Sequence, residues 1–300
     1  MTTLKYILGP MRLPFLMLTP ACVILGLSTA VWTTGKQDTI NFVSFLLAMT
    51  GAFAAHISVN AFNEYFDFKS GLDLKTVRTP FSGGSGAIPE RPEFLLHALI
   101  TAVATFVLTA AIGVYFLITI GPGLLPLGLL GLIIIIIYTP WLTRSGILCL
   151  FAPGTGFGIL MVMGTDFVLT GGYSMTAFFA SLTPFFLVSN LLLLNQFPDV
   201  EADNSIGRSH FPGVAGRRKS SFIYTAFVLM TYLSIIFGVE LNYLPELCLI
   251  GLVTFIPAMF VCSGAYRHAD DIQKLVPLMG INVIITVATP LLVAMGLVLG

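Results

Sequence analysis

The stretch NFVSFLLAMTGAFAAHISVNAFNEYFDFKSGLD, residues 41–73, joins an apolar run to an acidic end. Its first 22 residues contain no Asp, Glu, Lys or Arg, and about 20 such residues are enough to cross a bilayer as a helix. The last eleven residues then hold Glu64, Asp67 and Asp73, with Lys69 as the only base. A spanning helix that ends in this way needs a binding partner for its carboxylates.

The remainder of the chain has the composition of a membrane protein. Of its 300 residues, 56% are hydrophobic and only 9% are charged, and the mean hydropathy is +0.95. A soluble domain carries about 25% charged residues, so most of this surface is suited to lipid rather than to water. The composition predicts a polytopic membrane protein surrounded by membrane lipid, and it indicates neither a nucleic-acid partner nor a protein partner.

Apolar windows near 20 residues long predict nine spanning helices. They lie near residues 13–34, 41–62, 94–118, 122–140, 147–170, 174–197, 220–240, 244–264 and 274–299. The expected fold class is an all-α integral membrane protein, in which a bundle of nine transmembrane helices with two aspartate-rich cytoplasmic loops forms a single domain over residues 1–300.

Basic residues fall almost entirely on one side of this topology. With the N-terminus inside, thirteen of the fourteen Lys and Arg residues lie on the cytoplasmic side: Lys5, Arg12, Lys69, Lys75, Arg78, Arg91, Arg144, Arg208, Arg217, Arg218, Lys219, Arg267 and Lys274. Only Lys36 lies outside, and such an asymmetry is typical of cytoplasmic loops. Two long inner loops, 63–93 and 199–219, also hold most of the acidic residues. We therefore expect the N-terminus and both acidic loops on the cytoplasmic side.

The end of the sixth predicted helix repeats the pattern at the end of the second. NQFPD, residues 195–199, matches NEYFD, residues 63–67, in its Asn, aromatic and Asp positions. The Asn and Asp of this second motif and Asp203 follow one another at i+4 intervals and share one face while the helix continues. A kink is expected at Pro198, and the echo is compatible with an internal duplication.

The second predicted helix also carries a polar stripe. His56, Asn60, Asn63, Asp67 and Ser70 recur at spacings of four and three residues, so they share one helical face. Polar groups in a spanning helix normally face the bundle interior or a wet cavity. Solvation of the helix end would account for Asn63 but not for His56, so a cavity is expected along this face.

Carboxylates this close together repel each other unless a cation lies between them, and hard oxygen ligands beside phosphate suit Mg²⁺. Bases that bind phosphate oxygens follow both acidic clusters, namely Lys75 and Arg78 in the first loop and Arg208, Arg217, Arg218 and Lys219 in the second. Either basic cluster alone would more often anchor lipid headgroups. The interleaving of acids and bases favours a Mg²⁺–diphosphate site instead.

Two other features of the loops have simpler interpretations. SGGSG, residues 82–86, offers a backbone nest for anions, although a flexible linker is the favoured interpretation. His97 and His210 show no metal-ligand spacing and are interpreted as ordinary loop or helix-end residues.

By these residues the chain resembles the UbiA superfamily of intramembrane prenyltransferases, whose members have nine helices and two aspartate-rich cytoplasmic loops after helices two and six. NEYFDFKSGLD is similar to the first motif in its 1,4-dihydroxy-2-naphthoate prenyltransferase (MenA-like) form. The resemblance implies that Asn63, Asp67 and Asp73 bind Mg²⁺ and diphosphate. Glu64 stands where the family usually has Asp.

NQFPDVEADNSIGR, residues 195–208, resembles the second motif of the family. The resemblance implies that Asn195, Asp199 and Asp203 hold the other metal ion and that Arg208 contacts phosphate.

YTPWLTRSG, residues 138–146, is similar to the family's loop after helix four, where a tyrosine and a basic residue line the site. In this chain they are Tyr138 and Arg144. The catalytic residues implied by the resemblance are Asp67, Asp199, Glu64 and Tyr138, with Asp67 or Glu64 assisting proton loss. The implied diphosphate-binding residues are Asn63, Lys75, Arg78, Arg144, Asn195 and Arg208.

The implied function is Mg²⁺-dependent transfer of an isoprenyl chain from a prenyl diphosphate to a small aromatic acceptor. The MenA-like features favour 1,4-dihydroxy-2-naphthoate, which gives a menaquinone precursor. Acceptors used elsewhere in the superfamily stay open: 4-hydroxybenzoate, homogentisate, chlorophyllide, haem and glycerol phosphate.

A secondary transporter or channel is the alternative from a different class. Transporters bind ions near the bilayer midplane on broken helices, whereas the acids of this chain cluster at helix ends. His56, Asn60 and Asn282 are among the few strongly polar residues deep within the predicted spans. This distribution favours an enzyme at the membrane surface, and the intact acidic motifs argue against a family member that has lost catalysis.

Overall fold

The computed structural model describes residues 3–35 and 40–300, and within these ranges it contains helices and no β-strand. The predicted all-α class is therefore confirmed for the described residues. Lys36, the one base expected on the outer side, lies outside them.

Eight helical segments among the described residues are long and apolar enough to cross a membrane. They are Leu13–Thr34, which contains α2 (Leu18–Thr34); α3 (Phe42–Lys69); Pro92–Thr119, which contains α5 (Leu95–Thr119); Gly146–Thr170, which contains α7 (Gly146–Gly154) and α8 (Gly164–Thr170); α9 (Met175–Asn195); α12 (Arg217–Glu240); Glu246–Arg267, which contains α13 (Phe255–Arg267); and α14 (Ile272–Leu299). Each overlaps a span expected from the sequence.

The ninth expected span, 122–140, is shorter than the others. It forms the apolar helical segment Pro122–Ile137, which contains α6 (Leu125–Ile137). Proline disfavours the α conformation of the residue before it, so Pro140 limits the segment at its end. All nine expected segments are thus helical, and the ninth transmembrane helix stays a prediction.

Polar caps mark where several spans begin. The side chains of Asn41, Ser145, Ser174 and Asp271 each accept a hydrogen bond from the backbone N–H three residues later. Such caps satisfy donors that the first turn of a helix leaves free. At its other end, α8 is closed by Gly171 in the left-handed conformation.

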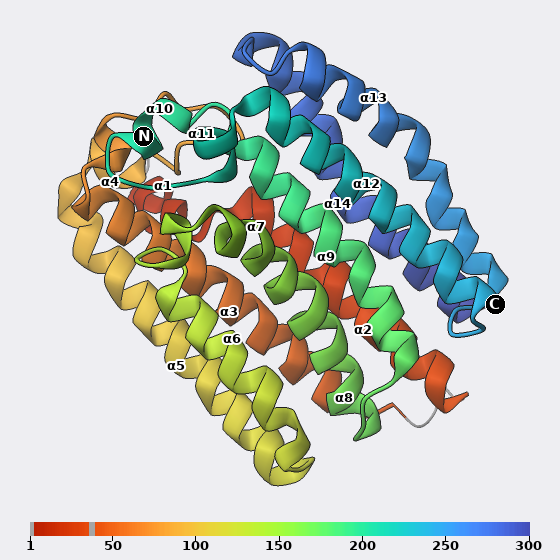
Figure 1. The fold of residues 1–300 in the computed structure, drawn as a ribbon. Coiled ribbons are helices and arrows are strands. Elements are labelled where there is room, and N and C mark those ends of the chain that lie inside the picture. The colour runs from red at the N-terminus through yellow and green to blue at the C-terminus, as the bar shows by residue number, and fades with distance from the viewer. Residues whose placement is uncertain (1–2, 36–39) are drawn as a thin grey trace.

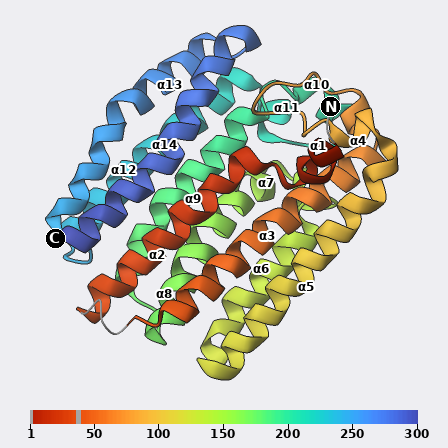
Figure 2. The ribbon, with the colours of Figure 1, turned by 180° about the vertical axis from the view of Figure 1, so that it is seen from behind.

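The long helices lie side by side in one bundle, as Figure 1 and the view from behind in Figure 2 show. Four short helices gather at one end of it, which we call the polar end: α1 (Thr3–Leu8), α4 (Ala87–Glu90), α10 (Val200–Asn204) and α11 (Phe211–Ala215). The connection between α5 and α6 lies at the opposite end (Figure 1).

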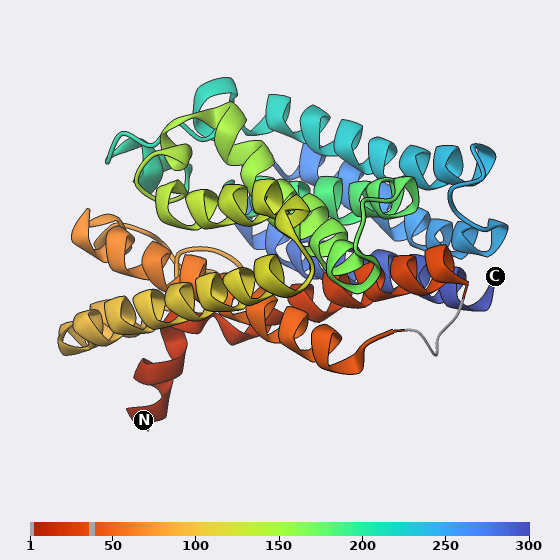
Figure 3. The same ribbon diagram turned by 90° about the horizontal axis from the view of Figure 1, so that it is seen from below.

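Packing differs between the two sides of the bundle. The main buried core is built mostly from α2, α9, α12, α13 and α14, whereas α3 packs along α5, with α6 beside them (Figure 3). A second, smaller buried cluster lies near the α5–α6 connection. A cavity lies between α3, α5, α6 and the segment from α7 to α8.

The two acidic helix ends differ from their expected forms. Helix α3 continues to Lys69, seven residues beyond the predicted end, and so carries Asn63 and Asp67 on helical backbone. Helix α9 instead ends at Asn195, and α10 begins only after a turn. Pro198 thus accompanies a break rather than the expected kink, in keeping with the loss of a backbone donor at proline.

Candidate active site

One cavity of about 390 Å³ begins at the polar end and continues between the helices. Its polar part is lined by residues from both acidic loops and from the N-terminal segment: Arg12, Asn63, Asp67, Asp73, Asn195, Asp199, Asp203, Arg208 and His210. Its apolar part, which we call the apolar arm, is lined by α3, α5, α6 and residues 152–168. Two motifs 132 residues apart in sequence therefore open into one space.

The expected polar stripe of α3 faces this cavity. His56, Asn60, Asn63 and Asp67 all line it, whereas Ser70, the last residue of the expected stripe, is exposed and lies outside the lining. His56 is buried, and its Nδ1 lies 2.8 Å from Thr19 Oγ1, which fixes the ring inside the span. The periodicity of the sequence thus gave the correct face of the helix.

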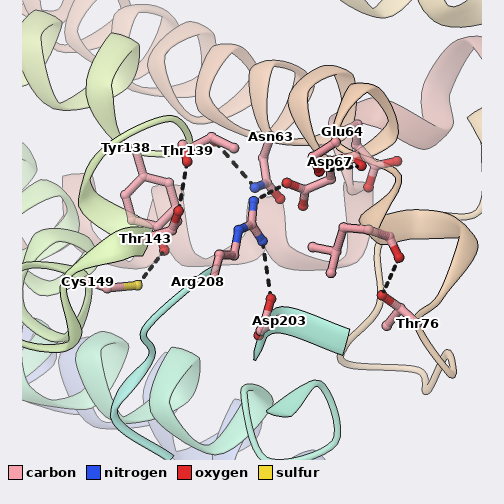
Figure 4. A network of polar contacts seen from close by, with 12 residues as sticks. Asn63, Glu64, Asp67, Thr76, Tyr138, Thr139, Thr143, Cys149, Asp203 and Arg208 are labelled. Carbon is pink, nitrogen blue, oxygen red and sulfur yellow. Dashed lines mark hydrogen bonds and ion pairs between the residues drawn. The ribbon is translucent and has the colours of Figure 1, made fainter. Parts of the chain in front are cut away.

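Arg208 joins the two acidic loops. One of its terminal nitrogens donates to Asp67 Oδ1 on α3, and the other lies 3.5 Å from Asp203 Oδ1 on α10 (Figure 4). All three side chains are at least nine-tenths buried. A charged pair removed from water needs good geometry to be stable, so this bridge fixes the position of both loops.

His210 continues the network beyond Asp203. Its Nδ1 lies 2.8 Å from Asp203 Oδ2, and the residue lines the cavity. Burial by itself would lower the pKa of His210, but the hydrogen bond with Asp203 outweighs burial and raises the pKa to about 10. An imidazolium–carboxylate pair is therefore the stable form at neutral pH.

Arg12 holds the end of α3 from the other side. Its Nε donates to Glu64 Oε1 at 2.9 Å, and its Nη2 donates to Asn63 Oδ1 at 2.8 Å. The backbone of Arg12 is in the left-handed conformation, with φ of 51°. A non-glycine residue rarely adopts this conformation unless its surroundings stabilise it, and here the two hydrogen bonds to α3 do so.

The SGGSG segment is an ordered part of the site rather than a flexible linker. Ser85 donates to Glu64 twice, from its backbone N–H and from its hydroxyl, each at 2.7 Å. Gly83, Gly84 and Gly86 all have positive φ, a conformation that glycine adopts without strain. The segment can therefore fold tightly against α3, and the backbone of Gly83 hydrogen-bonds Asp199.

Several buried oxygens of the site have no hydrogen-bond partner among the described residues. They are Asp73 Oδ2, Asn195 Oδ1 and Asp199 Oδ1. Burial, together with the neighbouring carboxylates Asp67 and Glu64, raises the pKa of Asp73 to about 8. Burial and the nearby Asp203 raise the pKa of Asp199 to about 7. Unpaired buried oxygens are costly, and a cation bound between them would remove that cost.

The donor set fits Mg²⁺ bound together with a diphosphate. In the described part of the chain, no three carboxylate, imidazole or thiolate side chains meet closely enough to form a metal cage by themselves. Mg²⁺ does not need such a cage, because it usually binds one or two carboxylates and completes its shell with water and substrate phosphate. The unpaired oxygens of Asp73, Asn195 and Asp199 are ligands of that kind.

Four of the expected site residues lie outside the cavity lining. Lys75 is exposed, and its Nζ donates to Ser205 Oγ at 3.2 Å, which links the two loops. Arg78 faces Glu90, with 3.8 Å between Nη1 and Oε1, and Arg144 is exposed on a short turn. Glu64 is fully buried, but Arg12 and Ser85 occupy its oxygens.

Tyr138 does line the cavity, with a small polar group behind it. Its hydroxyl lies 3.9 Å from Cys149 Sγ, and Gln196 Nε2 donates to the same sulfur at 3.4 Å (Figure 4 shows Tyr138 and Cys149). Tyr138 is therefore placed as expected beside the polar part of the cavity.

Arg12, Ser85 and His210 are parts of the site that the sequence did not reveal. Arg12 stands 51 residues from Asn63, and a single base before the first span is also what the positive-inside pattern requires. A weak signal existed for Ser85, since an anion-binding nest was one interpretation of its segment. For His210 no spacing pattern was available, because its partner Asp203 lies across a turn.

One buried carboxylate lies away from this site, and its role is structural. Asp166 on α8 accepts hydrogen bonds from Thr29 at 2.8 Å and from Ser174 at 2.9 Å. Both of its oxygens are thus satisfied, and the contacts tie α2, α8 and the start of α9 together. An acid inside a span can mark an ion pathway, but this one is fully paired.

Comparisons with known proteins agree with this geometry. The family model described as the UbiA prenyltransferase family matches residues 18–295. The chain is 26% identical to the 1,4-dihydroxy-2-naphthoate octaprenyltransferase of Bacillus subtilis (strain 168) over 223 residues, which cover 71% of this chain and 67% of that protein.

Solved structures share the fold at low sequence identity. A structure from a study of digeranylgeranylglyceryl phosphate synthase in membranes matches with a TM-score of 0.67 at 16% identity, covering 99% of both chains. A UbiA homologue from Archaeoglobus fulgidus bound to GPP and Mg²⁺ matches with a TM-score of 0.61 at 13% identity, covering 97% of this chain and 99% of the other. The family match over nearly the whole length, together with the shared fold and the joined acidic loops, leads to one assignment: this chain belongs to the UbiA prenyltransferase family and is a membrane prenyltransferase.

Proposed function

We propose that this enzyme transfers a prenyl chain from a prenyl diphosphate to 1,4-dihydroxy-2-naphthoate, in a Mg²⁺-dependent reaction. The observation that carries the proposal is the single cavity, in which both acidic motifs open at the polar end and lead into an apolar arm. A prenyl diphosphate has the same two parts, a polyanionic head and a long apolar tail.

The head belongs at the polar end and the tail in the apolar arm. Removing the tail from water is favourable at roughly 25 cal/mol per Å² of apolar surface, and the arm offers apolar walls for it. The head would bring phosphate oxygens to Asp73, Asn195 and Asp199, each of which has one oxygen without a partner in the described part of the chain. Two negatively charged groups can meet there only with cations between them.

Mg²⁺, when bound by the acidic residues and the diphosphate, would neutralise charge on the leaving group. The proposed ligands are those of the two motifs, Asn63, Asp67 and Asp73 with Asn195, Asp199 and Asp203. The chain's own cations add to this effect, because Arg208, which is nine-tenths buried, and the partly exposed Arg12 both line the polar part. Fixed charges aimed at a departing anion stabilise its developing charge without further reorganisation.

The reaction replaces one bond by another. The C–O bond between the prenyl carbon and the diphosphate breaks and diphosphate leaves with the electron pair. A ring carbon of the acceptor forms the new C–C bond, and that carbon gives up its proton to the departing diphosphate. Glu64 is poorly placed to take this proton, since its oxygens already accept from Arg12 and Ser85. We assign Glu64 instead to the positioning of Arg12 and of the SGGSG segment.

The acceptor is proposed from the relative in Bacillus subtilis, whose name specifies 1,4-dihydroxy-2-naphthoate. The resemblance of the NEYFDFKSGLD motif to the MenA-like form supports the same choice. We further propose that α6 completes a set of nine transmembrane helices, and that the polar end with its thirteen bases faces the cytoplasm.

The test is prenyl transfer in purified, lipid-reconstituted protein with radiolabelled prenyl diphosphate. Dihydroxynaphthoate, 4-hydroxybenzoate and homogentisate are offered in parallel, each with Mg²⁺ or with EDTA. The expected result is labelled naphthoate that requires Mg²⁺ and disappears in Asp67→Asn and in Asp199→Asn. The matched control is Asp270→Asn, because Asp270 is an exposed acid outside the cavity lining.

Labelling of another acceptor alone would refute the naphthoate assignment and keep the chemistry. Labelling that persists in EDTA, or in both Asp variants, would refute the proposed Mg²⁺ site.

A further inference from the structure

Glycines in the spans of this protein are of two kinds. At Gly26 and Gly158, an added Cβ would lie within 2.6 Å of backbone atoms of a neighbouring segment, so these glycines allow close helix packing, their usual role in membrane bundles. At four others an added Cβ would meet no described atom within 4 Å: Gly113, Gly128, Gly156 and Gly164. Close packing does not explain these four.

All four of these open glycines line the apolar arm. A side chain at each of these positions would therefore extend into open space at the wall of the arm. Residues 152–168 form one wall of the arm, and the residues that line the cavity recur there at every fourth position. This stretch includes a π-helical segment, Thr155–Met163. Such π segments are frequent at functional sites.

Three buried side chains line the end of the arm that lies farthest from the acidic motifs. Phe116, Leu124 and Val168 line the cavity there and are only 3–8% exposed, and together with Phe167 they form a separate buried cluster. They come from three segments, α5, the start of the α6 segment and α8, near the α5–α6 connection (Figure 1). We call Phe116, Leu124 and Val168 the floor.

Each floor residue has an open glycine one helical turn closer to the polar end. Gly113 precedes Phe116 by three residues, Gly128 follows Leu124 by four, and Gly164 precedes Val168 by four. Because α5 and α8 run away from the polar end while α6 runs towards it, all three glycines lie on the same side of the floor. We call Gly113, Gly128 and Gly164 the collar.

Helix α3 gives the distance from the collar to the acidic end. Thr109 Oγ1 donates to Gly51 O at 3.5 Å, and Ile112 packs against Gly51, so Gly51 lies near the level of Gly113. Sixteen residues separate Gly51 from Asp67, which corresponds to about 24 Å of helix. The arm is thus deep enough for a chain of several isoprene units.

We propose that the collar and the floor set the length of prenyl chain that this enzyme accepts. The inference rests on the proposed function, which places the diphosphate at the acidic end. The collar keeps the arm wide down to the floor, so a tail of matching length buries its last unit there. A longer tail would have to displace buried floor side chains, and a shorter one would leave apolar space unfilled.

The experiment measures selectivity for chain length in the full-length protein in lipid. Geranyl, farnesyl, geranylgeranyl and octaprenyl diphosphates are compared by kcat/KM and, without any acceptor, by the rise in Tm that each causes in the presence of Mg²⁺. Gly113→Leu and Gly128→Leu fill the collar, and Gly128→Ala gives a milder step. Phe116→Ala lowers the floor, and Leu129→Phe adds bulk to α6 on its exposed side as the matched control.

The expected result is a shift in opposite directions. Leucine in the collar lowers the ratio of kcat/KM for the longest accepted chain to that for geranyl diphosphate by at least about tenfold, the effect of a few methylene groups in a pocket. Phe116→Ala moves the optimum to longer chains, and Leu129→Phe leaves the ratio as in wild type. The Tm profile shifts with chain length in the same way.

A length profile that is the same in all of these variants would overturn the inference, since the tail would then leave the arm sideways between helices. If Gly128→Leu fails to fold, Gly128→Ala and Phe116→Ala decide the outcome. Failure of the proposed function looks different, because wild type would then show no Mg²⁺-dependent stabilisation by any prenyl diphosphate.

Discussion

The two acidic helix ends share a sequence pattern but are built differently. At the end of α3, the acids on the helix itself are paired, because Arg208 pairs with Asp67 while Arg12 and Ser85 hold Glu64. Only Asp73, four residues beyond the helix, has a buried oxygen without a partner among the described residues. At the end of α9, the helix stops and leaves buried oxygens of Asn195 and Asp199 without partners among the described residues. The end of α3 is therefore an organised frame, whereas the free ligands come from the end of α9 and from Asp73. A repeated motif therefore does not imply a repeated role.

The largest effects are expected from removing one carboxylate at each end, and the two variants should differ in stability although both lose activity. Both Asp67→Asn and Asp199→Asn should lower kcat/KM by about 10³-fold, because each removes charge that would hold metal and leaving group. Their effects on the metal-free protein should be opposite. Asp67→Asn lowers Tm because it breaks the buried pair with Arg208, whereas Asp199→Asn raises Tm because it removes a negative charge that is buried beside Asp203.

The measurement is Tm in EDTA beside initial rates with Mg²⁺. Equal losses of Tm in both variants would show that Asp67 and Asp199 contribute equally to the stability of the metal-free protein, which would contradict the difference between the two ends.

The second effect concerns the bridge between the ends. Arg208→Gln should lower kcat/KM by about 10²-fold and the free energy of unfolding by about 3 kcal/mol, since it leaves Asp67 and Asp203 without their shared cation. The two effects are separated by a double-mutant cycle with Asp67→Asn. Additive losses of stability would mean that there is no coupling free energy between Arg208 and Asp67, so that their ion pair does not stabilise the protein.

The third effect is a dependence on pH. The pKa of Asp73 is raised to about 8 and that of Asp199 to about 7, from an ordinary value of 3.8. The folded protein therefore binds protons that the unfolded chain has already lost, so the metal-free protein should lose stability as the pH rises between these values. The raised pKa of His210, about 10, acts in the same direction above its ordinary 6.5.

Mg²⁺ with diphosphate should reverse this trend, because metal binding releases the protons of its ligands. Calorimetry in buffers of different ionisation enthalpy measures that release directly. Binding near pH 7 with no proton release would contradict the raised pKa values of Asp73 and Asp199.

A smaller effect is expected where the frame supports the site indirectly. Glu64→Gln keeps the shape but loses the charge that faces Arg12 and Ser85, and groups that orient ligands typically contribute about 10- to 100-fold. We expect a loss of about tenfold in kcat/KM and faster hydrogen exchange at residues 82–86. Ser85→Ala should reproduce the exchange effect. Unchanged exchange in both variants would remove Glu64 from the frame.

The smallest effect belongs to the bases outside the cavity. Lys75→Ala and Arg144→Ala should each change kcat/KM by less than about twofold, because these side chains are exposed and their charges are screened by solvent. Steady-state rates at low and physiological salt test this. A tenfold loss in either variant would show that the loops close over the substrate and bring these bases inward.

Much of the fold follows from local signals in the sequence. The lengths of the apolar runs predicted where the spanning helices begin and end to within a few residues, except at α3, which continues into its acidic end. The period of the polar stripe gave the face of α3 that lines the cavity. What the sequence lacked was long-range pairing: the contact of Arg12 with Asn63 joins residues 51 apart, and that of Arg208 with Asp67 joins residues 141 apart. Arg12 makes its contact from a residue in the left-handed conformation. Arg208 makes its contact from the segment that follows the helix break near Pro198.

The most direct test of a single Mg²⁺–diphosphate site is electron paramagnetic resonance of Mn²⁺, used in place of Mg²⁺. Spectra are recorded with wild type, Asp67→Asn and Asp199→Asn, each with and without geranyl diphosphate. We predict that bound Mn²⁺ appears in wild type together with the diphosphate, shows coupling to phosphorus, and is lost in both variants. Mn²⁺ that binds equally in all three proteins, or without coupling to phosphorus, would contradict the conclusion that the two acidic ends form one site.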